Sequence, residues 1–301
     1  MKTVLITGAG GVLGKELIKQ LIPNYRILAL HITHAFPETN SAESNISHFN
    51  YQEEETEHIP WKEVDVLIHC AFSRSFKGEA LAASLKFSKN ILTIAAHKGI
   101  KAIINISSRS VYGQNENIPW TENTMESPDS MYALAKYSGE LILQFIKKEF
   151  PEVSCTNIRL AGLIGIGMDT RIVSKLICNV LKGENINLIG GKQNFSFLDT
   201  RDAASGIVAL LSSDPEKWNI TYNLGNHRSY TLYELAHLIV EISTSYTRKK
   251  TDITIEDQDI KLIDSMDSSL FYNQMHWTPQ YDITDTIDML FQHFSQTSFS
   301  K

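Results

Sequence analysis

Cysteine is scarce in this sequence, which has three cysteines among 301 residues and no CxxC spacing. Cys70, Cys155 and Cys178 lie far apart, which argues against a disulfide scaffold or a zinc site and favours a reducing compartment. The ten histidines are scattered without the spacing of metal ligands, so we expect no metal site. A long apolar run is missing too, since no stretch approaches the roughly 18 to 20 apolar residues of a membrane span. These absences favour a cytoplasmic protein that does not act at a membrane.

A basic surplus is also absent, because 28 Lys and Arg residues face 34 Asp and Glu residues, a formal net charge of −6. This balance argues against nucleic acid or an anionic membrane as a partner. With 43% hydrophobic and 21% charged residues, the composition is that of an ordinary globular protein. The length suits one large domain or two closely joined ones.

Short β-branched runs alternate with helical patterns in the first half of the chain. Some of these runs, such as VDVLIHCA, are apolar without alternation, as expected for strands covered on both faces. This order predicts an α/β fold, a doubly wound parallel sheet with crossover helices. The expected strands are Thr3–Thr7, Arg26–His31, Asp65–Cys70, Ala102–Ser107 and Ser154–Leu160, and the expected helices are Val12–Leu21, Glu79–His97 and Tyr132–Phe150.

The alternation of strand and helix patterns changes after about residue 160, where the predicted elements become shorter. We expect residues 1–160 to form a dinucleotide-binding domain and residues 161–301 to form mostly a smaller substrate lobe, with some segments returning to the first domain. The shorter elements are Ser205–Leu211, Tyr222–Leu224 and Thr231–Ser243. The segment from Thr33 to Pro60 is polar and weakly patterned, and we assign no element to it.

The first strand runs directly into TGAGGVLG, in which Gly8, Gly11 and Gly14 have the spacing GxxGxxG. A tight turn from strand to helix needs residues without Cβ atoms, and the free N–H groups at a helix start attract a pyrophosphate. The position of the glycines after the first strand and before a helix is the context that this motif requires. The sequence therefore predicts a dinucleotide site.

One feature of such sites is missing from the second strand, RILALHIT. An acidic residue about 20 residues after the glycines would bind the ribose hydroxyls of NAD. The strand ends at His31 instead, and no Asp or Glu occurs between Glu16 and Glu38. Arginine, which binds the 2′-phosphate of NADP, is absent from this strand end too. The cofactor is therefore NAD or NADP, and the choice is open.

Tyr132 and Lys136 are four residues apart on a predicted helix, which places them on nearly the same face. A free tyrosine has a pKa near 10, about three units too high for a base at neutral pH. A neighbouring ammonium in a partly desolvated cleft stabilises the phenolate by the required order of magnitude, about 4 kcal/mol. The YxxxK spacing is weak evidence alone, because Tyr246 and Lys250 share it.

The stretch NISSRSVYG distinguishes Tyr132 from Tyr246. Ser108 follows an apolar strand 24 residues before Tyr132, and nothing comparable precedes Tyr246. A serine hydroxyl at a strand end can hydrogen-bond a substrate hydroxyl or carbonyl while a nearby tyrosine moves the proton. Ser108, Tyr132 and Lys136 are therefore the candidate catalytic residues.

With these motifs in place, the chain resembles an extended short-chain dehydrogenase/reductase of the NAD-dependent epimerase/dehydratase family. The resemblance covers nearly the whole chain. The matching pieces, in order, are TGAGGVLG, DVLIHCAF, NISSRSVYG, MYALAKYSGE, IRLAGLIGIG, FSFLDTRDAASGI, YNLGNHRSYTLYELA and HWTP.

The resemblance implies a Rossmann-type fold with a small C-terminal substrate lobe and roles for individual residues. Ser108 would orient the substrate, Tyr132 would be the base, and Lys136 would hold the nicotinamide ribose and tune the tyrosine. A homodimer through the helices Glu79–His97 and Tyr132–Phe150 is implied as well. The implied cofactor contacts are Gly8, Gly11, Val12, Leu13, Gly14, His31, Ala71, Tyr132, Lys136 and Leu163.

Two departures from the family pattern bear on the reaction. Dehydratases of the family carry an acidic residue beside the catalytic Ser or Thr, but Arg109 and Ser110 follow Ser108 here, which argues against a 4,6-dehydratase. Epimerases acting on nucleotide sugars often have an asparagine after the strand at Arg159, but this chain reads LAGLIG, which weakens the case for a UDP-sugar.

The substrate contacts are open between two interpretations. Arg74, Ser107 and Arg109 lie in or before loops on the cofactor side, where an arginine could clamp a phosphate or carboxylate. The alternative is that each arginine forms a local surface salt bridge. We expect Arg201 to be structural and to pair with Asp199 or Asp202, and the ring of His69 to be satisfied by backbone groups.

Three functions follow as alternatives. The leading hypothesis is an NAD(P)-dependent epimerase or ketoreductase that acts on a sugar nucleotide or related sugar through a 4-keto species. The second is an NADPH-dependent reductase of a non-sugar carbonyl. The third is a cofactor-binding sensor without chemistry, which the presence of both Tyr132 and Lys136 disfavours. The expected partners are a small-molecule substrate and a second copy of the chain.

Overall fold

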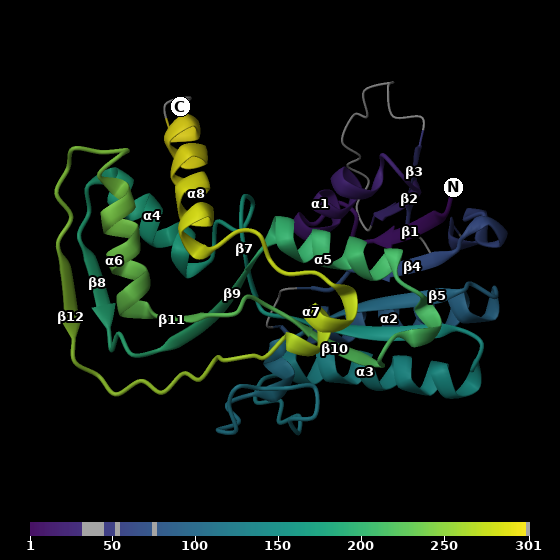
Figure 1. Ribbon diagram of the computed structural model, residues 1–301. Coiled ribbons are helices and arrows are strands. Elements are labelled where there is room, and N and C mark those ends of the chain that lie inside the picture. Colours follow the sequence, from purple (N-terminus) through teal and green to yellow (C-terminus); the bar gives the residue numbers. More distant parts are fainter. Residues whose placement is uncertain (32–44, 52–54, 74–76, 299–301) are drawn as a thin grey trace.

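Parallel strands form the central sheet of the protein (Figure 1). A computed structural model describes residues 1–31, 45–51, 55–73 and 77–298, and over these residues the sheet has seven strands, in which every neighbouring pair is parallel. Their order across the sheet is β10 (Thr221–Leu224), β6 (Ser154–Leu160), β5 (Ala102–Ser108), β4 (Val66–His69), β1 (Thr3–Thr7), β2 (Arg26–His31) and β3 (Ile46–Asn50).

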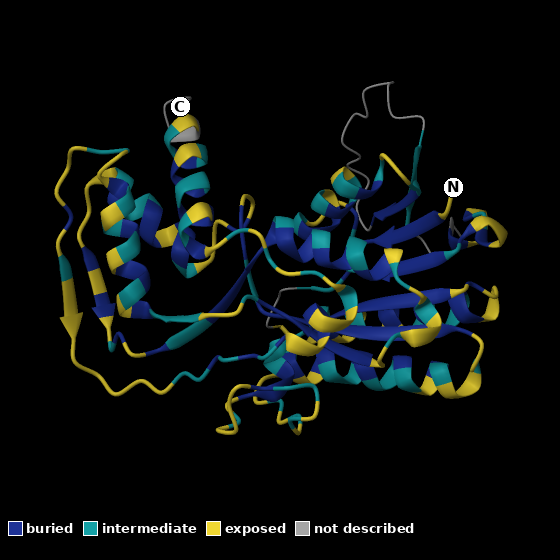
Figure 2. Ribbon diagram, viewed as in Figure 1, coloured by how far each residue is buried: buried dark blue, intermediate teal, exposed yellow. Residues whose placement is uncertain are grey.

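Helices cover both faces of this sheet. Because successive side chains of a strand point to opposite faces, Val4 and Ile6 of β1 join one core and Leu5 joins the other. Helices α1 (Val12–Leu21) and α5 (Thr200–Ser212) pack together on the first face, and α2 (Gly78–His97) and α3 (Met131–Glu149) pack together on the second. Figure 2 shows the strands as the most deeply buried part of the molecule.

The predicted doubly wound α/β fold is confirmed by this arrangement. The strand order runs one way from β1 to β2 and β3, and the other way from β1 to β4 and β5. At such a reversal the loops after neighbouring strands diverge, which leaves a crevice at the carboxyl ends of β1 and β4. Most predicted elements of the first half are confirmed to within one residue at each end.

The chain returns to the central sheet after residue 160. The predicted elements Ser205–Leu211 and Tyr222–Leu224 fall in α5, which packs on α1, and in β10, which pairs with β6. The division into a dinucleotide-binding part and a substrate lobe remains a prediction.

The remaining elements form a smaller lobe, on the left in Figure 1. In its core, α4, α6 and α8 pack together around residues such as Ile177, Ile239 and Phe291. Its helices are α4 (Ile172–Lys182), α6 (Leu232–Ser243) and α8 (Ile283–Ser298), and its strands are β7 (Gly162–Ile164), β8 (Ile186–Ile189), β9 (Asn194–Asp199), β11 (Ser229–Thr231) and β12 (Ile253–Glu256). Short 3-10 helices occur at Glu55–His58, Trp61–Glu63, Arg109–Tyr112 and Pro215–Lys217, and α7 spans Ser269–Met275.

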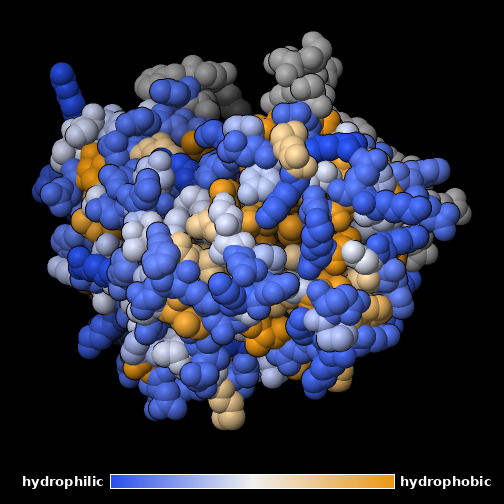
Figure 3. Space-filling model, turned by 45° about the vertical axis from the view of Figure 1, so that its right-hand side comes forward, coloured by the Kyte–Doolittle hydropathy of each residue, from blue (hydrophilic) through white to orange (hydrophobic). Residues whose placement is uncertain are grey.

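The surface shown in Figure 3 is mostly hydrophilic, with apolar side chains grouped near its centre. None of the helices within the described ranges is both long enough and apolar enough to span a membrane.

Candidate active site

The glycine turn after β1 packs tightly against the end of β4. Gly8 has φ +68°, and a Cβ atom on it would lie 2.8 Å from the Cα of Ala71. A Cβ atom on Gly14 would lie 2.8 Å from the Cα of Ala9. Real Cβ atoms do not approach so closely, so the turn requires glycine at both positions. The predicted contacts Gly8, Gly14 and Ala71 therefore lie together at the crevice.

The start of α1 suits the pyrophosphate of a dinucleotide. The N-cap of the helix is Gly11, no side chain caps it, and the first turn has no acidic residue. The first N–H groups of a helix have no partner within the helix, and the helix dipole makes this end positive. The N–H groups from Val12 to Gly14 are thus available to an anion, and these residues fit NAD(P) at this place.

Other predicted cofactor contacts border the same turn. A Cβ atom on Gly10 would lie 3.4 Å from Nδ1 of His31, so the histidine ring faces the turn. Leu163, on β7, is partly buried against the core beneath this face of the sheet. The loop after β7 reaches α1, since a Cβ atom on Gly167 would lie 3.1 Å from Cγ2 of Val12. The end of β2 and the start of the small lobe thus both approach the glycine turn.

Phe72 connects the glycine crevice to the predicted base. It directly follows Ala71, and its ring meets the ring of Tyr132 edge to face, with 6.1 Å between the centroids. The Nζ atom of Lys136 lies 4.1 Å from the centre of the Phe72 ring and donates a hydrogen bond of 2.8 Å to the carbonyl oxygen of Ile106. Tyr132 and Lys136 therefore meet on one aromatic ring beside the crevice, although the sequence did not single out Phe72.

Lys136 places a positive charge among buried groups, since only 7% of it is exposed. Burial and, to a smaller extent, the charge of Lys136 together lower the pKa of His69 to about 3. Burial raises the pKa of the Cys70 thiol to about 12, although Lys136 opposes this. The surroundings of Lys136 are thus poorly solvated, and in such surroundings an ammonium interacts strongly with a neighbouring anion.

The ring of His69 is satisfied by side chains, and the prediction of backbone partners was wrong. Its Nδ1 atom lies 2.8 Å from Oγ1 of Thr7, and its Nε2 atom lies 2.8 Å from Oγ of Ser88. Thr7 also accepts a hydrogen bond from the N–H of Ala71. These contacts join β1, β4 and α2 directly behind the crevice.

The two adjacent serines at the end of β5 have different surroundings. Ser108 is partly exposed, and its Oγ atom accepts hydrogen bonds from the N–H and the hydroxyl of Ser110, at 3.2 and 3.0 Å. The hydroxyl hydrogen of Ser108 is not used in these bonds. Ser107 is buried and donates a hydrogen bond to Glu140 of α3. Ser107 is thus part of the interior, whereas Ser108 remains partly exposed at the end of β5.

Glu140 belongs to a buried group of charges centred on Arg159 of β6. Arg159 donates hydrogen bonds to Glu140 and to the hydroxyl of Tyr112, and it also contacts Glu126. Only 1% of Arg159 and none of Glu140 is exposed. This group joins β5, β6 and α3, the elements that carry Ser108 and Tyr132.

Arg109 pairs with an aspartate of the C-terminal part of the chain. Its guanidinium lies 2.7 Å from the carboxylate of Asp264, which is fully buried, while 23% of the Arg109 side chain is exposed. This contact agrees with the salt-bridge interpretation and leaves part of the Arg109 side chain exposed. Arg74, the other predicted clamp, lies outside the described residues.

The second YxxxK pair has no such surroundings. Tyr246 donates a hydrogen bond of 2.6 Å to Asp288, and Lys250 forms an exposed ion pair with Asp252. Arg201 pairs with Asp199 at 2.7 Å, which confirms the expected pairing with an aspartate.

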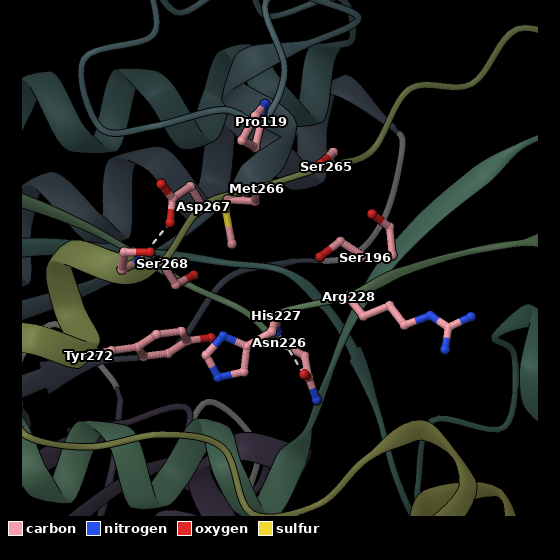
Figure 4. Close-up of a pocket in the computed structure, with 12 residues that line it drawn as sticks. Pro119, Ser196, Asn226, His227, Arg228, Ser265, Met266, Asp267, Ser268 and Tyr272 are labelled. Carbon is pink, nitrogen blue, oxygen red and sulfur yellow. Dashed lines mark hydrogen bonds between the residues drawn. The ribbon is translucent and has the colours of Figure 1, made fainter.

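A polar pocket of about 250 Å³ lies between β9, the loop after β10 and the start of α7 (Figure 4). Its lining includes Ser196, residues 226–229 and residues 265–269. Arg228 points away from the other residues, while the rings of His227 and Tyr272 lie together with 4.5 Å between their centroids. No predicted site residue is among those that line it within the described chain. The pocket nevertheless adjoins the predicted site, because Ser265 follows the Asp264 that holds Arg109.

Known proteins resemble this chain along most of its length. An uncharacterized epimerase/dehydratase from Staphylococcus epidermidis is 27% identical over an alignment of 304 residues, which covers 94% of each chain. The dTDP-glucose 4,6-dehydratase of Streptomyces griseus is 23% identical, over 79% of this chain and 77% of the enzyme. The crystal structure of UDP-glucuronic acid 4-epimerase from Bacillus cereus, in complex with UDP-glucuronic acid and NAD, has a TM-score of 0.80 and 20% identity, over 98% of this chain and 99% of that one.

A family profile described as the NAD dependent epimerase/dehydratase family matches residues 4–225. The match spans the glycine turn, both serines, Tyr132 and Lys136, and it confirms the resemblance drawn from these motifs. The expected cofactor class, NAD(P), is confirmed with it. The chain belongs to the NAD dependent epimerase/dehydratase family.

Proposed function

We propose that this chain is an NAD(P)-dependent epimerase or ketoreductase that acts on a sugar nucleotide or a related sugar through a 4-keto species. The observation that carries the proposal is the meeting of Tyr132 and Lys136 on Phe72, next to Ala71 and the glycine turn. A sensor without chemistry would not need this buried ammonium beside a tyrosine.

Tyr132, Lys136 and Ser108 have different roles in the proposed proton transfer. The phenolate of Tyr132 removes the proton of the substrate hydroxyl, and the ammonium of Lys136 stabilises the phenolate. Ser108 donates its hydroxyl hydrogen to the same substrate oxygen, because its lone pairs already accept from Ser110. A nicotinamide bound at the crevice would supply the hydride acceptor for the hydrogen on the carbon that bears this oxygen. In an epimerase, Tyr132 would give its proton back to the carbonyl oxygen once the opposite face of the ketone is presented, whereas in a reductase Tyr132 would serve only as the proton donor.

A dehydratase is disfavoured within this proposal, although a 4,6-dehydratase is among the relatives. Elimination of water needs an acid and a base beside the carbon next to the ketone. The residues after Ser108 are Arg109 and Ser110, and Arg109 is held by Asp264. The side chain of Asp264 is fully buried against this arginine, so it has no exposed surface through which it could pass a proton to a substrate.

The polar pocket supports a hydroxylated substrate. Its hydroxyl, amide and carboxylate groups, among them Ser196, Asn226 and Asp267, suit a ligand rich in hydrogen-bonding groups better than an apolar ketone. A homodimer through α2 and α3 remains an expectation, and the exposed side chains of α3 include Leu134 and Phe145.

The test is the substitution Tyr132→Phe, with Tyr246→Phe as the matched control. Each protein is incubated with UDP- and dTDP-sugars and NAD(P), and products are identified by NMR while absorbance reports NAD(P)H. We expect Tyr132→Phe to lower the rate by at least about 100-fold, since the group that moves the proton is lost. Tyr246→Phe should keep the rate, because Tyr246 contacts Asp288 in the small lobe. Equal rates in both variants would contradict the proposed role of Tyr132.

A further inference from the structure

Strand β12 forms an open edge at the outer margin of the small lobe, away from the central sheet (Figure 1). It pairs with β8 in a parallel sheet of two strands, and no further strand of the described chain pairs with its other side. Figure 2 shows most of this strand as exposed, and its last three residues, Thr254, Ile255 and Glu256, are all exposed. The unpaired N–H and C=O groups of such an edge are a template for another strand.

The hydrogen bonds to β8 identify the groups of β12 that point to the open side. The carbonyls of Asp252 and Glu256 accept hydrogen bonds from the first residue of β8 and from the residue that follows β8. In a parallel pair, alternate residues of a strand bond the same neighbour. The N–H and C=O groups of Ile253 and Ile255 therefore point away from β8, toward the open side.

The apolar face of the two-stranded sheet is left incomplete at this edge. Ile186 and Leu188 of β8 are buried in the small-lobe core, and their neighbours in register on β12 are Ile253 and Ile255. Neighbours in register place their side chains on the same face of a sheet. Ile253 is partly buried, but 46% of Ile255 is exposed. A further strand beside β12 would extend this face and cover Ile255.

The charges that flank β12 have opposite signs at its two ends. Residues 248–250 read RKK, and residues 256–259 read EDQD. Antiparallel pairing of two copies places the basic end of each strand beside the acidic end of the other, whereas parallel pairing places like charges together. Opposite charges across a strand pair stabilise it, and like charges directly opposite each other destabilise it. The flanks thus favour a second copy of this chain as the partner, in the antiparallel sense.

One antiparallel register fits these charges best. A two-fold axis at Ile253 places Lys250 of each copy opposite Glu256 of the other, and Asp252 opposite Thr254. With the axis at Asp252 or at Thr254 instead, Asp252 lies opposite another carboxylate. Lys250 contacts Asp252 of its own copy at 3.2 Å in an exposed ion pair, and such a pair contributes little, so its exchange for Glu256 of the other copy costs little.

We propose that two copies of this chain associate through antiparallel pairing of their β12 strands, with the two-fold axis at Ile253. The two small sheets then join into one, in the order β8, β12, β12 and β8, and their apolar faces continue across the axis. This contact is separate from the homodimer expected through α2 and α3, and it does not rest on the proposed function.

Charge reversal tests the pairing. Lys250→Glu and Glu256→Lys each create like-charge pairs when present alone, but they create only opposite-charge pairs when the two variants are mixed. Sedimentation velocity compares the full-length wild type, each variant and the equimolar mixture at concentrations from micromolar to millimolar. We expect each variant to raise the dissociation constant by at least about 10-fold, and the mixture to recover the wild-type value.

The recovery in the mixture is specific to contact between copies. Residues 250 and 256 of one copy are about 20 Å apart along an extended strand, so they cannot form this pair within a copy. Lys217→Glu is the control, because it makes the same change of charge at an exposed lysine of the 3-10 helix Pro215–Lys217. It should associate as the wild type does, and any contact through α2 and α3 should be unchanged in all samples.

Several results would overturn the inference. These are variants that associate as well as the wild type, and a mixture that associates no better than its components. A wild type that is a monomer at every concentration leaves the edge to a strand of another protein and also overturns it.

Hydrogen exchange of the wild type decides the question if a variant does not fold. Peptides that cover residues 251–257 should exchange more slowly at high than at low protein concentration, and equal exchange overturns the inference. None of these measurements needs a cofactor or a substrate, so their failure leaves the proposed reaction untouched.

Discussion

Arg159 shows how a single charged residue supports the site without touching a substrate. It is 1% exposed, yet its guanidinium contacts Glu140, Glu126 and the hydroxyl of Tyr112, which in turn donates to Asn223 of β10. A buried cation with this many partners is satisfied, whereas the loss of one partner leaves charge uncompensated in a poorly solvated place. The side chain therefore ties α3 to the strands that carry the crevice.

We expect Glu140→Gln to lower the free energy of unfolding by about 3 kcal/mol, because Arg159 loses its most buried carboxylate partner. Urea denaturation followed by circular dichroism measures the change. Glu149→Gln, at the exposed end of the same helix, removes a charge of the same sign and should change the free energy by less than about 0.5 kcal/mol. Similar losses in both variants would mean that the buried ion pair does not stabilise the fold.

The sequence could place two serines at the end of β5 but could not assign their surroundings. Successive side chains of a strand point to opposite faces, so Ser107 and Ser108 cannot both face the crevice. The partner of Ser107 is Glu140, 33 residues away, so this hydrogen bond does not follow from local spacing, whereas Ser108 is bonded by Ser110, two residues further on. The sequence did not identify Phe72 either, because its contacts with Tyr132 and Lys136 join residues that are far apart in the chain.

At the scale of elements, α6 begins with a complete capping box that is visible in the sequence as TLYE. The Thr231 side chain accepts a hydrogen bond from the N–H of Glu234, and the Glu234 side chain accepts one from the N–H of Thr231. Two N–H groups that would otherwise lack partners are satisfied at the helix start. Helix α6 contributes Leu235 and Ile239 to the small-lobe core, so the cap also supports that lobe.

Thr231→Ala should lower the free energy of unfolding by about 1 kcal/mol, the usual cost of losing an N-cap side chain. Thermal unfolding and urea unfolding both measure this change in the free energy of unfolding. Thr244→Ala makes the same chemical change at the other end of α6, where the exposed hydroxyl bonds only the carbonyl of Glu241, and should have less than half the effect. A larger loss at Thr244 would contradict the assignment of the cap.

The strands that the sequence predicted correctly are those with continuous apolar runs. The strands Thr3–Thr7 and Arg26–His31 are buried along nearly their whole length, which is why their composition identified them. Strand β3 lies within the polar segment to which we assigned no element, and all five of its residues are only partly buried. It is one of the two edge strands of the sheet, and unlike the other, β10, it is not fully buried, so burial imposes little pattern on it.

For the molecule as a whole, the small lobe and the central sheet are joined by the segment just before α7. The N–H of Ile263 donates to Gln114, the N–H of Trp120 donates to the carbonyl of Ser265, and Asp264 pairs with Arg109. The segment thus lies along the loop that follows Ser108. No periodicity in the sequence reveals a contact between residues about 150 positions apart, and this is why Asp264 was not a candidate.

Asp264 makes the stability of the whole molecule depend on pH in a direction opposite to that of most carboxylates. Burial raises the pKa of its carboxyl from 3.8 to about 6, although the Arg109 guanidinium acts to lower it. Between about pH 4 and pH 6 the folded state holds a proton that the unfolded chain has released. The contribution of this group to stability is therefore fully present below pH 4 and is lost as the pH rises through 6.

The substitution Asp264→Asn isolates this effect, because other titrating groups cancel when the two proteins are compared at each pH. The free energy of unfolding of the wild type, minus that of the variant, should fall by about 2 kcal/mol from pH 4 to pH 6 and stay constant above pH 7. The same difference for Asp257→Asn, at an exposed aspartate nearby, should be flat. A difference for Asp264→Asn that rises with pH would mean that attraction to Arg109 outweighs burial, and the ion pair would then stabilise the junction of the lobe and the sheet at neutral pH.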